Sequence, residues 1–420
     1  MTGTDTPPAD PAGEVRDWRR ALLEAVAEGN SVTVTVLAFV AAIVVGGLLI
    51  AFTDPTVLRH FSHFFSAPGS ALGAAWSSAS GAYTAMFRGA VLDIHTVNAA
   101  LHGGSVSAVF APLSETFLNA TPLILAGLAV MLPFRCGLFN IGASGQFIGG
   151  AIVAGYLGFA VQLPPVIHVV VAVAGGVAGG AACGWLIGYL RARTGANEVI
   201  TTIMFNYVAQ YLLLYLLGTQ VFRRPKRIDP ISKVVHGTAR LPHIAGGSLR
   251  VNFGFVIALA AAAGVSWLMR RSTLGFELRT VGANPDAARA AGMNVERSFV
   301  IVMMLAGALA GLAGAAVVLG QDFSLTPGIY GTYGFDAITV ALLGRGTALG
   351  VVLAALLYGG LHAGGVQMQA ATQTPIDIVT VIQAVVVLFI AAPPLVRTIF
   401  RLRGQKSGPE EKAALKVVGA

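Results

Sequence analysis

The chain has 420 residues, of which 55% are hydrophobic and only 11% are charged, and its formal net charge is +8. A soluble chain would carry charge on about a quarter of its residues, so this composition excludes an ordinary soluble protein. The mean hydropathy is +0.75, and apolar stretches of about 20 residues, enough to cross a bilayer as a helix, recur along the chain. The sequence therefore predicts an all-α polytopic membrane protein.

Hydropathy predicts about ten transmembrane helices, one of them short, within a membrane domain that covers residues 32–400. The predicted spans are 32–53, 112–133, 142–161, 165–190, 198–219, 252–269, 298–319, 335–344, 349–367 and 377–397. Ten crossings place both tails on one side, and Lys and Arg favour the cytoplasmic side. We therefore expect the tails, residues 1–31 and 401–420, in the cytoplasm.

Residues 54–107 follow the first span and are interrupted by Pro68 and by many Gly, Ser and His residues. One interpretation is an external segment with amphipathic pieces that lie along the membrane interface. A poorly packed linker is the other interpretation, and the residues do not decide between them.

A glycine-rich polar run, FRCGLFNIGASGQF, occupies residues 134–147 between two apolar stretches. It reads as a helix that breaks at membrane depth, which is tolerated where the backbone is buried in protein or lines a cavity. Asn140, Ser144 and Gln146 would then line a substrate pathway. The alternative is an ordinary cytoplasmic turn between two spans, with Arg135 as its anchor on that side.

Polar residues recur at steps of four in the predicted span 198–219, at Glu198, Thr202, Asn206 and Gln210. At 3.6 residues per turn they form one stripe about 18 Å long. Polar groups in a membrane usually face the bundle interior or a cavity. The stripe therefore predicts either a pathway lining or a packing seam between helices. Glu198, at the end of the span, also suits the positive end of the helix dipole.

The loop 220–251 is predicted to be external, yet it is strongly basic. Its cations are Arg223, Arg224, Lys226, Arg227, Lys233, Arg240 and Arg250. Asp229 is the only acidic residue of this loop. An external loop with such an excess of cations is contrary to the positive-inside rule, and it indicates that an acidic partner binds there. Anionic outer-leaflet lipid and a merely solvated loop are the alternatives.

The loop 270–297 is predicted to be cytoplasmic and to contain a short helix near 285–291. Asn284 can cap the helix, Pro285 suits its first position, Asp286 complements its first turn and Gly292 can end it. Its sequence, PDAARAA, consists mainly of small side chains, so the helix cannot bury an apolar stripe of its own. It suits a groove of another protein, and a helix lying on the membrane surface is the alternative.

Several chemistries have no support in the sequence. We find no G-x-x-x-x-G-K-[ST] phosphate loop, no H-E-x-x-H and no G-x-S-x-G motif, so we predict no catalytic residues and no ATPase activity in this chain. Cys136 and Cys183 both lie in apolar runs, so no metal site is predicted. Basic residues that flank spans are topology signals, so we expect no nucleic-acid partner.

Five runs carry a resemblance to a known family. They are GLFNIGASGQF (137–147), GANEVITTIMFNYVAQ (195–210), STLGFELRTVGANPDAARAAGM (272–293), GFDAITVALLGRG (334–346) and GGVQMQ (364–369). Together they resemble permease subunits of ABC importers in the branched-chain amino acid, ribose and nucleoside permease superfamily. The resemblance is strongest to nucleoside permeases that work with basic-membrane-protein-type binding lipoproteins, and it covers roughly residues 112–400.

The resemblance implies a type II importer-like fold with a broken helix and a cytoplasmic coupling helix, in a bacterial cytoplasmic (inner) membrane. The partners it implies are a second homologous permease subunit in a heterodimer, a cytoplasmic ABC ATPase that binds ATP and Mg, an extracytoplasmic substrate-binding lipoprotein and membrane lipids. This chain itself needs no cofactor. Ser144 stands where such permeases usually carry Glu, so no acidic role is expected there.

Three groups of site residues follow from the runs and the resemblance together. The substrate pathway is assigned to Phe139, Asn140, Ser144, Gln146, Thr202, Asn206 and Gln210. The ATPase coupling surface is assigned to Glu277, Arg279, Asn284, Pro285, Ala287, Ala288, Arg289 and Gly292. Docking of the binding protein is assigned to Arg223, Arg224 and Arg227.

We therefore expect a permease that imports nucleosides by alternating access. An importer of a pentose or another simple sugar is the first alternative. A stand-alone secondary transporter is the second, disfavoured because the spans contain few acids. A membrane enzyme is disfavoured by the missing catalytic motifs.

Overall fold

The structure is a computed structural model that describes residues 31–244, 246 and 249–391. It divides into two compact units: one combines the chain up to Ala75 with the residues from Asp377 onward, and the other is Trp76–Ile376. The regular elements of the described residues are helices, and the only extended pairings among them are two isolated bridges, Arg223 with Ser232 and His243 with Asn252. The predicted all-helical class is therefore confirmed for this part of the chain.

The smaller unit contains α2 (Ser31–Thr53), α3 (Pro55–Phe61), the start of α4 (Pro68–Ala90) and α16 (Asp377–Ala391). The chain turns by 81° between α2 and α3. Asp54 fixes this turn, because its side chain accepts a 2.7 Å hydrogen bond from the Thr56 amide and caps α3. Helix α16 packs on α2, with Ala38 and Phe389 buried between them.

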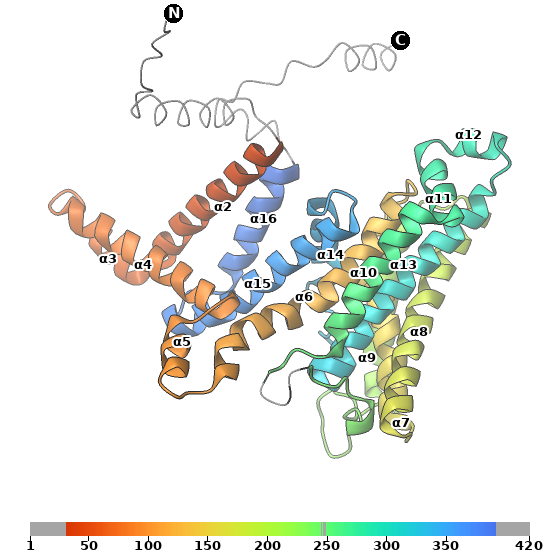
Figure 1. Ribbon diagram of the computed structural model, residues 1–420, viewed down its shortest axis with the longest axis horizontal. Coiled ribbons are helices and arrows are strands. Elements are labelled where there is room, and N and C mark those ends of the chain that lie inside the picture. The colour runs from red at the N-terminus through yellow and green to blue at the C-terminus, as the bar shows by residue number, and fades with distance from the viewer. Residues whose placement is uncertain (1–30, 245, 247–248, 392–420) are drawn as a thin grey trace, which may run out of the picture. The chain divides into compact units, whose positions relative to one another are not determined.

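The larger unit holds the remaining helices. They are the end of α4, α5 (Ile94–Leu101), α6 (Val106–Phe134), α7 (Ala143–Ala160), α8 (Pro165–Thr194), α9 (Glu198–Gly218), η1 (Gly237–Ala239), α10 (Phe253–Arg271), α11 (Thr273–Ala283), α12 (Pro285–Ala290), α13 (Val295–Val317), η3 (Val318–Asp322), α14 (Tyr333–Leu343) and α15 (Ala348–Thr372). Figure 1 shows the long helices side by side, with α11 and α12 at one end and the connection 219–252 at the other.

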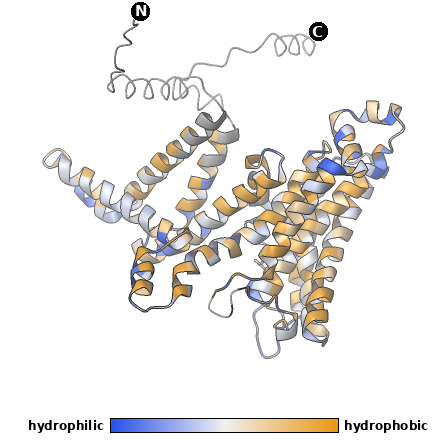
Figure 2. Cartoon of the chain, in the orientation of Figure 1, coloured by the Kyte–Doolittle hydropathy of each residue, from blue (hydrophilic) through white to orange (hydrophobic). Residues whose placement is uncertain are grey.

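Helix α6 is the centre of the larger unit, where it packs against α10, α13, α14 and α15. Its most apolar stretch is 83% buried, whereas those of α8 and α9 are only 22% buried in this chain. Apolar residues cover the outer helices as well as the inner ones, and hydrophilic colour gathers near α11 and α12 (Figure 2). A folded chain with an apolar outer surface of this kind belongs in lipid or against another membrane subunit.

Helices α8 and α13 approach closely because glycines face each other along their seam. A Cβ atom on Gly180 would collide with the backbone of Gly307 and Gly311, and one on Gly184 would collide with the Met303 carbonyl. Small residues let membrane helices pack backbone against backbone. The many glycines of the sequence therefore have a packing role here.

Seven helices of the described residues are long and apolar enough to cross a membrane, or eight if the bent pair α2–α3 counts as one span. Helix α14 is apolar but has only 11 residues, as expected for the short span. Residues 55–61, 68–90 and 94–101 are helical, but α5 has no buried residues, so the choice between an interfacial segment and a poorly packed linker for 54–107 stays a prediction. The predicted tails lie almost wholly outside the described residues, because only Ser31 is among them.

Candidate functional site

A cluster of three buried amides joins the connection 135–142 to α7 and α9. Asn140 and Gln146, both 0% exposed, bond to each other through both amide groups at 3.0 and 3.3 Å. Asn206 accepts a 2.8 Å bond from the Gly145 amide and donates a 3.0 Å bond to the Ile141 carbonyl. We call Asn140, Gln146 and Asn206 the amide cluster. Asn140 and Gln146 satisfy each other and Asn206 is satisfied by the backbone, as is usual for buried polar groups.

The run 134–147 contains the end of α6, the connection 135–142 and the start of α7, and both helices are candidate spans. A connection between two candidate spans agrees with the turn alternative. Its depth in the membrane and its cytoplasmic side stay predictions. Among the described residues, the pair of helices that is bent enough for a broken span or a re-entrant loop is α2–α3. Asn140, Ser144 and Gln146 are nevertheless buried, and the connection is bonded to α9 through Asn206 and the Ile141 carbonyl.

The other predicted pathway residues lie around the amide cluster in different environments. Thr202 is buried against Gly142, and its hydroxyl donates to the Glu198 carbonyl at 2.7 Å. Ser144 is also buried and lies against Gly334 of α14. Gln210 is half-buried, and Phe139 is 55% exposed. Thr202 and Asn206 thus share one buried face, as the four-residue spacing predicts, while Phe139 points outward.

A polar cavity of about 490 Å³ lies elsewhere in the larger unit and was not predicted from the sequence. We call it the polar cavity; its polar lining residues are Arg88, Asp93, Thr96, Glu115, Asn119, Arg250, His362 and Gln367. Arg250 and Glu115 form an ion pair at 3.2 Å on its wall. Its volume lies in the range of small-molecule sites, about 300 to 1,000 Å³.

Two sequence signals could have indicated this cavity. Glu115 and Asn119 are polar residues four apart on the long apolar helix α6, and Gln367 belongs to the GGVQMQ run of α15. Neither pattern shows which helices meet, because α15 is more than 200 residues away from the consecutive helices α4, α5 and α6. Gln367 makes no hydrogen bond within the described part of the chain and is exposed, so its amide is available to a ligand.

Helix α12 is present where the sequence predicted a short capped helix. The Asn284 side chain accepts 3.0 Å bonds from the Asp286 and Ala287 amides, and Pro285 occupies the first turn. Ala287 is exposed, but Ala288 is 0% exposed and packs toward α11 and α13. Ala288 therefore contributes to packing within this chain, whereas Ala287 lies on the exposed face of α12.

The remaining residues assigned to coupling hold this loop together. Arg289 bonds Asp286 at 3.1 Å and Glu296 at 3.0 Å, while Gly292, with φ +84°, ends the helix. Glu277 accepts a 2.8 Å bond from Ser298. Arg279 donates to the Met269 carbonyl.

The basic loop is anchored to the ends of the helix bundle. Ser232 bonds Leu325 in both directions, at 3.0 and 2.7 Å. Of the three arginines assigned to docking, Arg224 donates to the Ser232 carbonyl at 3.3 Å and Arg227 pairs with Asp229 at 2.7 Å. Arg223 is exposed and its side chain has no partner among the described residues.

Neither cysteine nor any acidic or histidine cluster offers a metal site in the described ranges, where no group of three or more His, Cys, Asp or Glu side chains comes together. Cys136 is 2% exposed in the connection 135–142. Burial, and secondarily the nearby Glu277 carboxylate, raise the pKa of its thiol to about 12. Cys136 therefore stays protonated and unreactive at neutral pH.

Comparison with known proteins gives several relatives that match about two thirds of the chain, while no solved structure matches it. The guanosine ABC transporter permease protein NupP of Bacillus subtilis is 36% identical over 286 residues, 68% of this chain and 82% of the relative. The glucose ABC transporter permease protein TsgB13 of Haloferax volcanii is 38% identical over 295 residues, with coverages of 66% and 75%. The nucleoside ABC transporter permease protein NupB of Lactococcus lactis is 33% identical over 294 residues, with coverages of 66% and 79%.

A family match covers the same part of the molecule. The family described as "Branched-chain amino acid transport system / permease component" matches residues 113–391, from early in α6 to the end of α16. This range includes the amide cluster, the basic loop and the loop around α12. The chain therefore belongs to this family of transport-system permeases.

Proposed function

We propose that the chain is the permease subunit of an ATP-driven ABC importer that carries nucleosides across the bacterial cytoplasmic membrane by alternating access. The observation that carries this proposal is the similarity to the guanosine permease NupP, 36% over 286 residues, together with that to the nucleoside permease NupB. The chain has no phosphate-loop motif of its own. A partner ATPase would therefore bind ATP and Mg and supply the energy.

The polar cavity is where this proposal places substrate contact in the present conformation. A nucleoside offers a flat base and a hydroxyl-rich ribose, and amides such as Asn119 and Gln367 can exchange hydrogen bonds with both. The amide cluster is closed in this conformation because Asn140 and Gln146 bond to each other, while Asn206 bonds to the backbone of Ile141 and Gly145. A substrate could reach it only after α7 and α9 separate, which alternating access allows.

The loop with α11 and α12 is proposed as the contact with the partner ATPase. Support comes from the exposed face of α12, where Pro285 and Ala287 present small apolar groups. The packed face of the same helix, through Ala288, and the ion pairs of Arg289 tie it to α13. A push on α12 would therefore be transmitted to the spans rather than absorbed by a loose loop.

The same proposal assigns the remaining partners and the orientation. A binding lipoprotein would dock on the external side at Arg223, and a second permease subunit and lipid would cover the apolar faces of α8 and α9, whose spans are 22% buried in this chain. With α14 and α16 counted beside the longer helices, the chain would cross the membrane about ten times. Both tails would then be cytoplasmic.

Import of a simple sugar is the second candidate, and one observation favours it. The glucose permease TsgB13 is 38% identical over 295 residues. We rank it below nucleosides because two of the three relatives described above are named for nucleosides or guanosine.

The test is uptake by cells or proteoliposomes that contain the complete transporter. We expect labelled guanosine to accumulate only with ATP, and unlabelled nucleosides to compete while glucose and ribose do not. The matched control is a complex whose ATPase subunit binds but does not hydrolyse ATP, and it should accumulate nothing. Accumulation of glucose with no competition by nucleosides would replace the proposal by its sugar alternative.

A further inference from the structure

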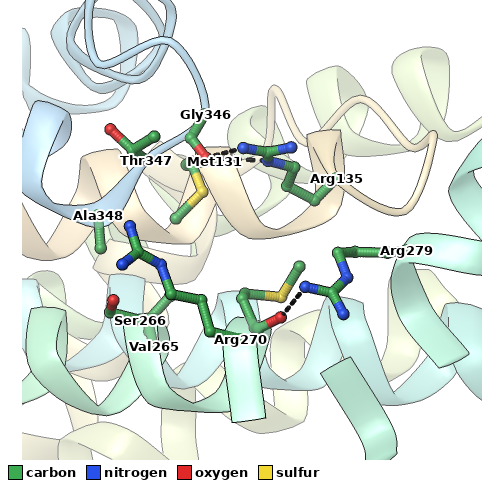
Figure 3. A pocket seen from close by; sticks show the side chains of 10 residues that line it. Met131, Arg135, Val265, Ser266, Arg270, Arg279, Gly346, Thr347 and Ala348 are labelled. Atoms are coloured by element: carbon green, nitrogen blue, oxygen red, sulfur yellow. Dashed lines mark hydrogen bonds between the residues drawn. The ribbon is translucent and has the colours of Figure 1, made fainter. Parts of the chain in front are cut away.

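Three arginines converge on a small cavity at the end of the bundle where α11 lies. The cavity has a volume of about 210 Å³ and is lined by Arg135, Arg270 and Arg279 together with Met131, Ser266 and Thr347, among others. Arg135 follows the last residue of α6, Arg270 is in the last turn of α10, and Arg279 lies on α11. Figure 3 shows Arg135 on one wall, and Arg270 and Arg279 on the opposite one. We call this cavity the arginine pocket.

Two of these guanidinium groups are held in place by backbone carbonyls. Arg135 donates to the Gly346 carbonyl from Nε at 2.9 Å and from Nη2 at 2.6 Å. Arg279 donates to the Met269 carbonyl. Each guanidinium has five N–H donors, so Arg135 and Arg279 each have further donors that these bonds do not use. Arg270 has no hydrogen bond within the described residues, and all five of its donors are unused.

No acidic side chain of the described residues balances the positive charge of the arginine pocket. No Asp or Glu is among the lining residues. The ion pairs of the described residues are formed by Arg191, Arg227, Arg250 and Arg289, so none involves the arginine pocket. Like charges that share a cavity repel one another unless an anion lies between them. All three residues are exposed enough for such an anion to reach them from outside the fold.

The chemistry of the site matches a phosphate group. Guanidinium forks bind phosphate oxygens with paired, charge-assisted hydrogen bonds. The amino end of the 25-residue helix α15 adds to the positive field, because its first residue, Ala348, also lines the cavity. Met131, Val265 and Ala348 make part of the wall apolar, which suits a phosphate attached to a carbon chain better than a free ion.

The place of the arginine pocket in the fold indicates the source of that phosphate. The three helices that end or begin there, α6, α10 and α15, are all candidate membrane spans. Their ends mark the depth at which hydrocarbon gives way to lipid headgroups. We propose that the arginine pocket binds a phosphate group, and that in the membrane this group belongs to an anionic phospholipid. The proposal does not depend on which substrate the protein carries.

Native mass spectrometry of the complete transporter, extracted from bilayers with equal phosphatidylglycerol and phosphatidylcholine, tests the proposal. We expect wild type to retain phosphatidylglycerol preferentially and Arg270→Gln to bind it about tenfold more weakly, since hydrogen bonds to a charged group are lost. Arg271→Gln is the matched control, because Arg271 is the next residue of the same helix end but does not line the arginine pocket. Arg270→Lys, which keeps the charge without the fork, should lie between wild type and Arg270→Gln.

The outcomes separate the possible occupants. Equal retention by wild type and Arg270→Gln, or equal losses in Arg270→Gln and Arg271→Gln, would overturn the proposal. If millimolar inorganic phosphate displaces the lipid and raises the melting temperature of lipid-free wild type but not of Arg270→Gln, the phosphate site stands and its lipid source is wrong. If Arg270→Gln releases the ATPase subunit with lipid retention unchanged, the arginine pocket binds a protein carboxylate instead. Arg270 makes no hydrogen bond to any other residue that the structure describes, so the variant should fold, and size-exclusion chromatography checks this.

Discussion

The amide cluster and the polar cavity are both polar regions inside an apolar helical unit, but their side chains are used in opposite ways. In the amide cluster, Asn140, Gln146 and Asn206 are buried and bond one another or nearby backbone. Gln367 lines the polar cavity, which has a volume of about 490 Å³, and it is exposed with no partner among the described residues. Polar residues in a membrane protein thus serve packing where they are satisfied internally and remain available to ligands where they are not.

The same contrast appears at both ends of the larger unit. On α12, Ala288 packs within the chain while its neighbour Ala287 is exposed. In the basic loop, Arg227 is paired with Asp229 while Arg223 is unpartnered in the described structure. Substituting an internally used residue should therefore damage the fold, and substituting an available one should damage function without damaging the fold.

The largest effect is expected from Asn206→Leu. Leucine has a similar volume but leaves the Gly145 amide and the Ile141 carbonyl without partners in the protein interior. We expect a loss of about 2 kcal/mol or more in stability, and low yields of folded protein. Thermal unfolding in detergent measures it. Gln210→Leu is the control, because Gln210 lies one turn along α9 and its side chain has no hydrogen bond in the part of the chain that the structure describes. Equal melting temperatures for both variants would show that the amide cluster does not hold α7 and α9 together.

Ala287→Trp should abolish transport while the permease still folds. The added volume lies on the exposed face of α12, where a well-packed contact with the ATPase would lose about 1 to 3 kcal/mol. Substrate-stimulated ATP hydrolysis and uptake by the assembled complex measure the effect. Ala288→Trp is the informative companion, because its side chain would push against α11 and α13 and lower the melting temperature of the chain itself. Unchanged hydrolysis in Ala287→Trp would remove α12 from the coupling surface.

Gln367→Ala should reduce uptake about tenfold with an unchanged melting temperature. One hydrogen bond to substrate is worth about 1 kcal/mol or somewhat more, and this amide stabilises nothing else in the described structure. Gln369→Ala is the matched control, since Gln369 is exposed on the same helix but does not line the polar cavity. Uptake that falls equally in both variants would argue against a substrate role for the polar cavity.

Thiol labelling should distinguish the two regions by a several-fold difference in rate. Cysteines at positions 119 and 367 should react with water-soluble reagents, whereas cysteines at 202 and 206 should be protected. The background lacks Cys136 and Cys183. Restoring Cys136 should add no labelling at pH 7 to 9, because its raised pKa of about 12 leaves the reactive thiolate unpopulated until far higher pH. Fast labelling at 206 in the resting state would show that the amide cluster is open to water.

The smallest effect is expected in the basic loop. Arg223→Ser should slow association of the binding protein a few-fold at low salt and flatten its salt dependence, since screening acts over about 8 Å at physiological ionic strength. Arg227→Ser should change less, because the Arg227 charge is already balanced by Asp229. Stopped-flow association at several salt concentrations measures both. Rates that match wild type at every concentration would exclude docking at this loop.

Much of the fold was predictable because its signals are local. Apolar stretches located α6, α7, α8, α9, α10 and α13 within a few residues, since a bilayer demands long apolar helices. The capped helix α12 was predicted from Asn284, Pro285 and Gly292, because capping depends on neighbouring residues only. The four-residue spacing of Thr202 and Asn206 correctly placed both on one buried face.

The sites were less predictable because they depend on contacts between distant segments. The sequence left open whether Asn140 and Gln146 line a pathway or belong to a turn, and only the folded connection 135–142 shows that they bond to each other and that Asn140 bonds to the Ala129 carbonyl. The sequence assigned Ala287 and Ala288 to the same coupling surface. Only the packing of α12 on α11 and α13 shows that Ala288 is buried while Ala287 is exposed. The polar cavity and the arginine pocket each draw residues from four segments or more.

The sequence by itself determined that this is a helical membrane protein with a capped loop helix, because composition, hydrophobic length and capping act over one helix or less. Its short motifs also indicated the permease family, which the match over residues 113–391 established. Only the tertiary structure decided which polar side chains are satisfied internally and which remain available. That distinction rests on distances between residues far apart in the chain, such as Arg135 and Gly346, and no local pattern encodes it.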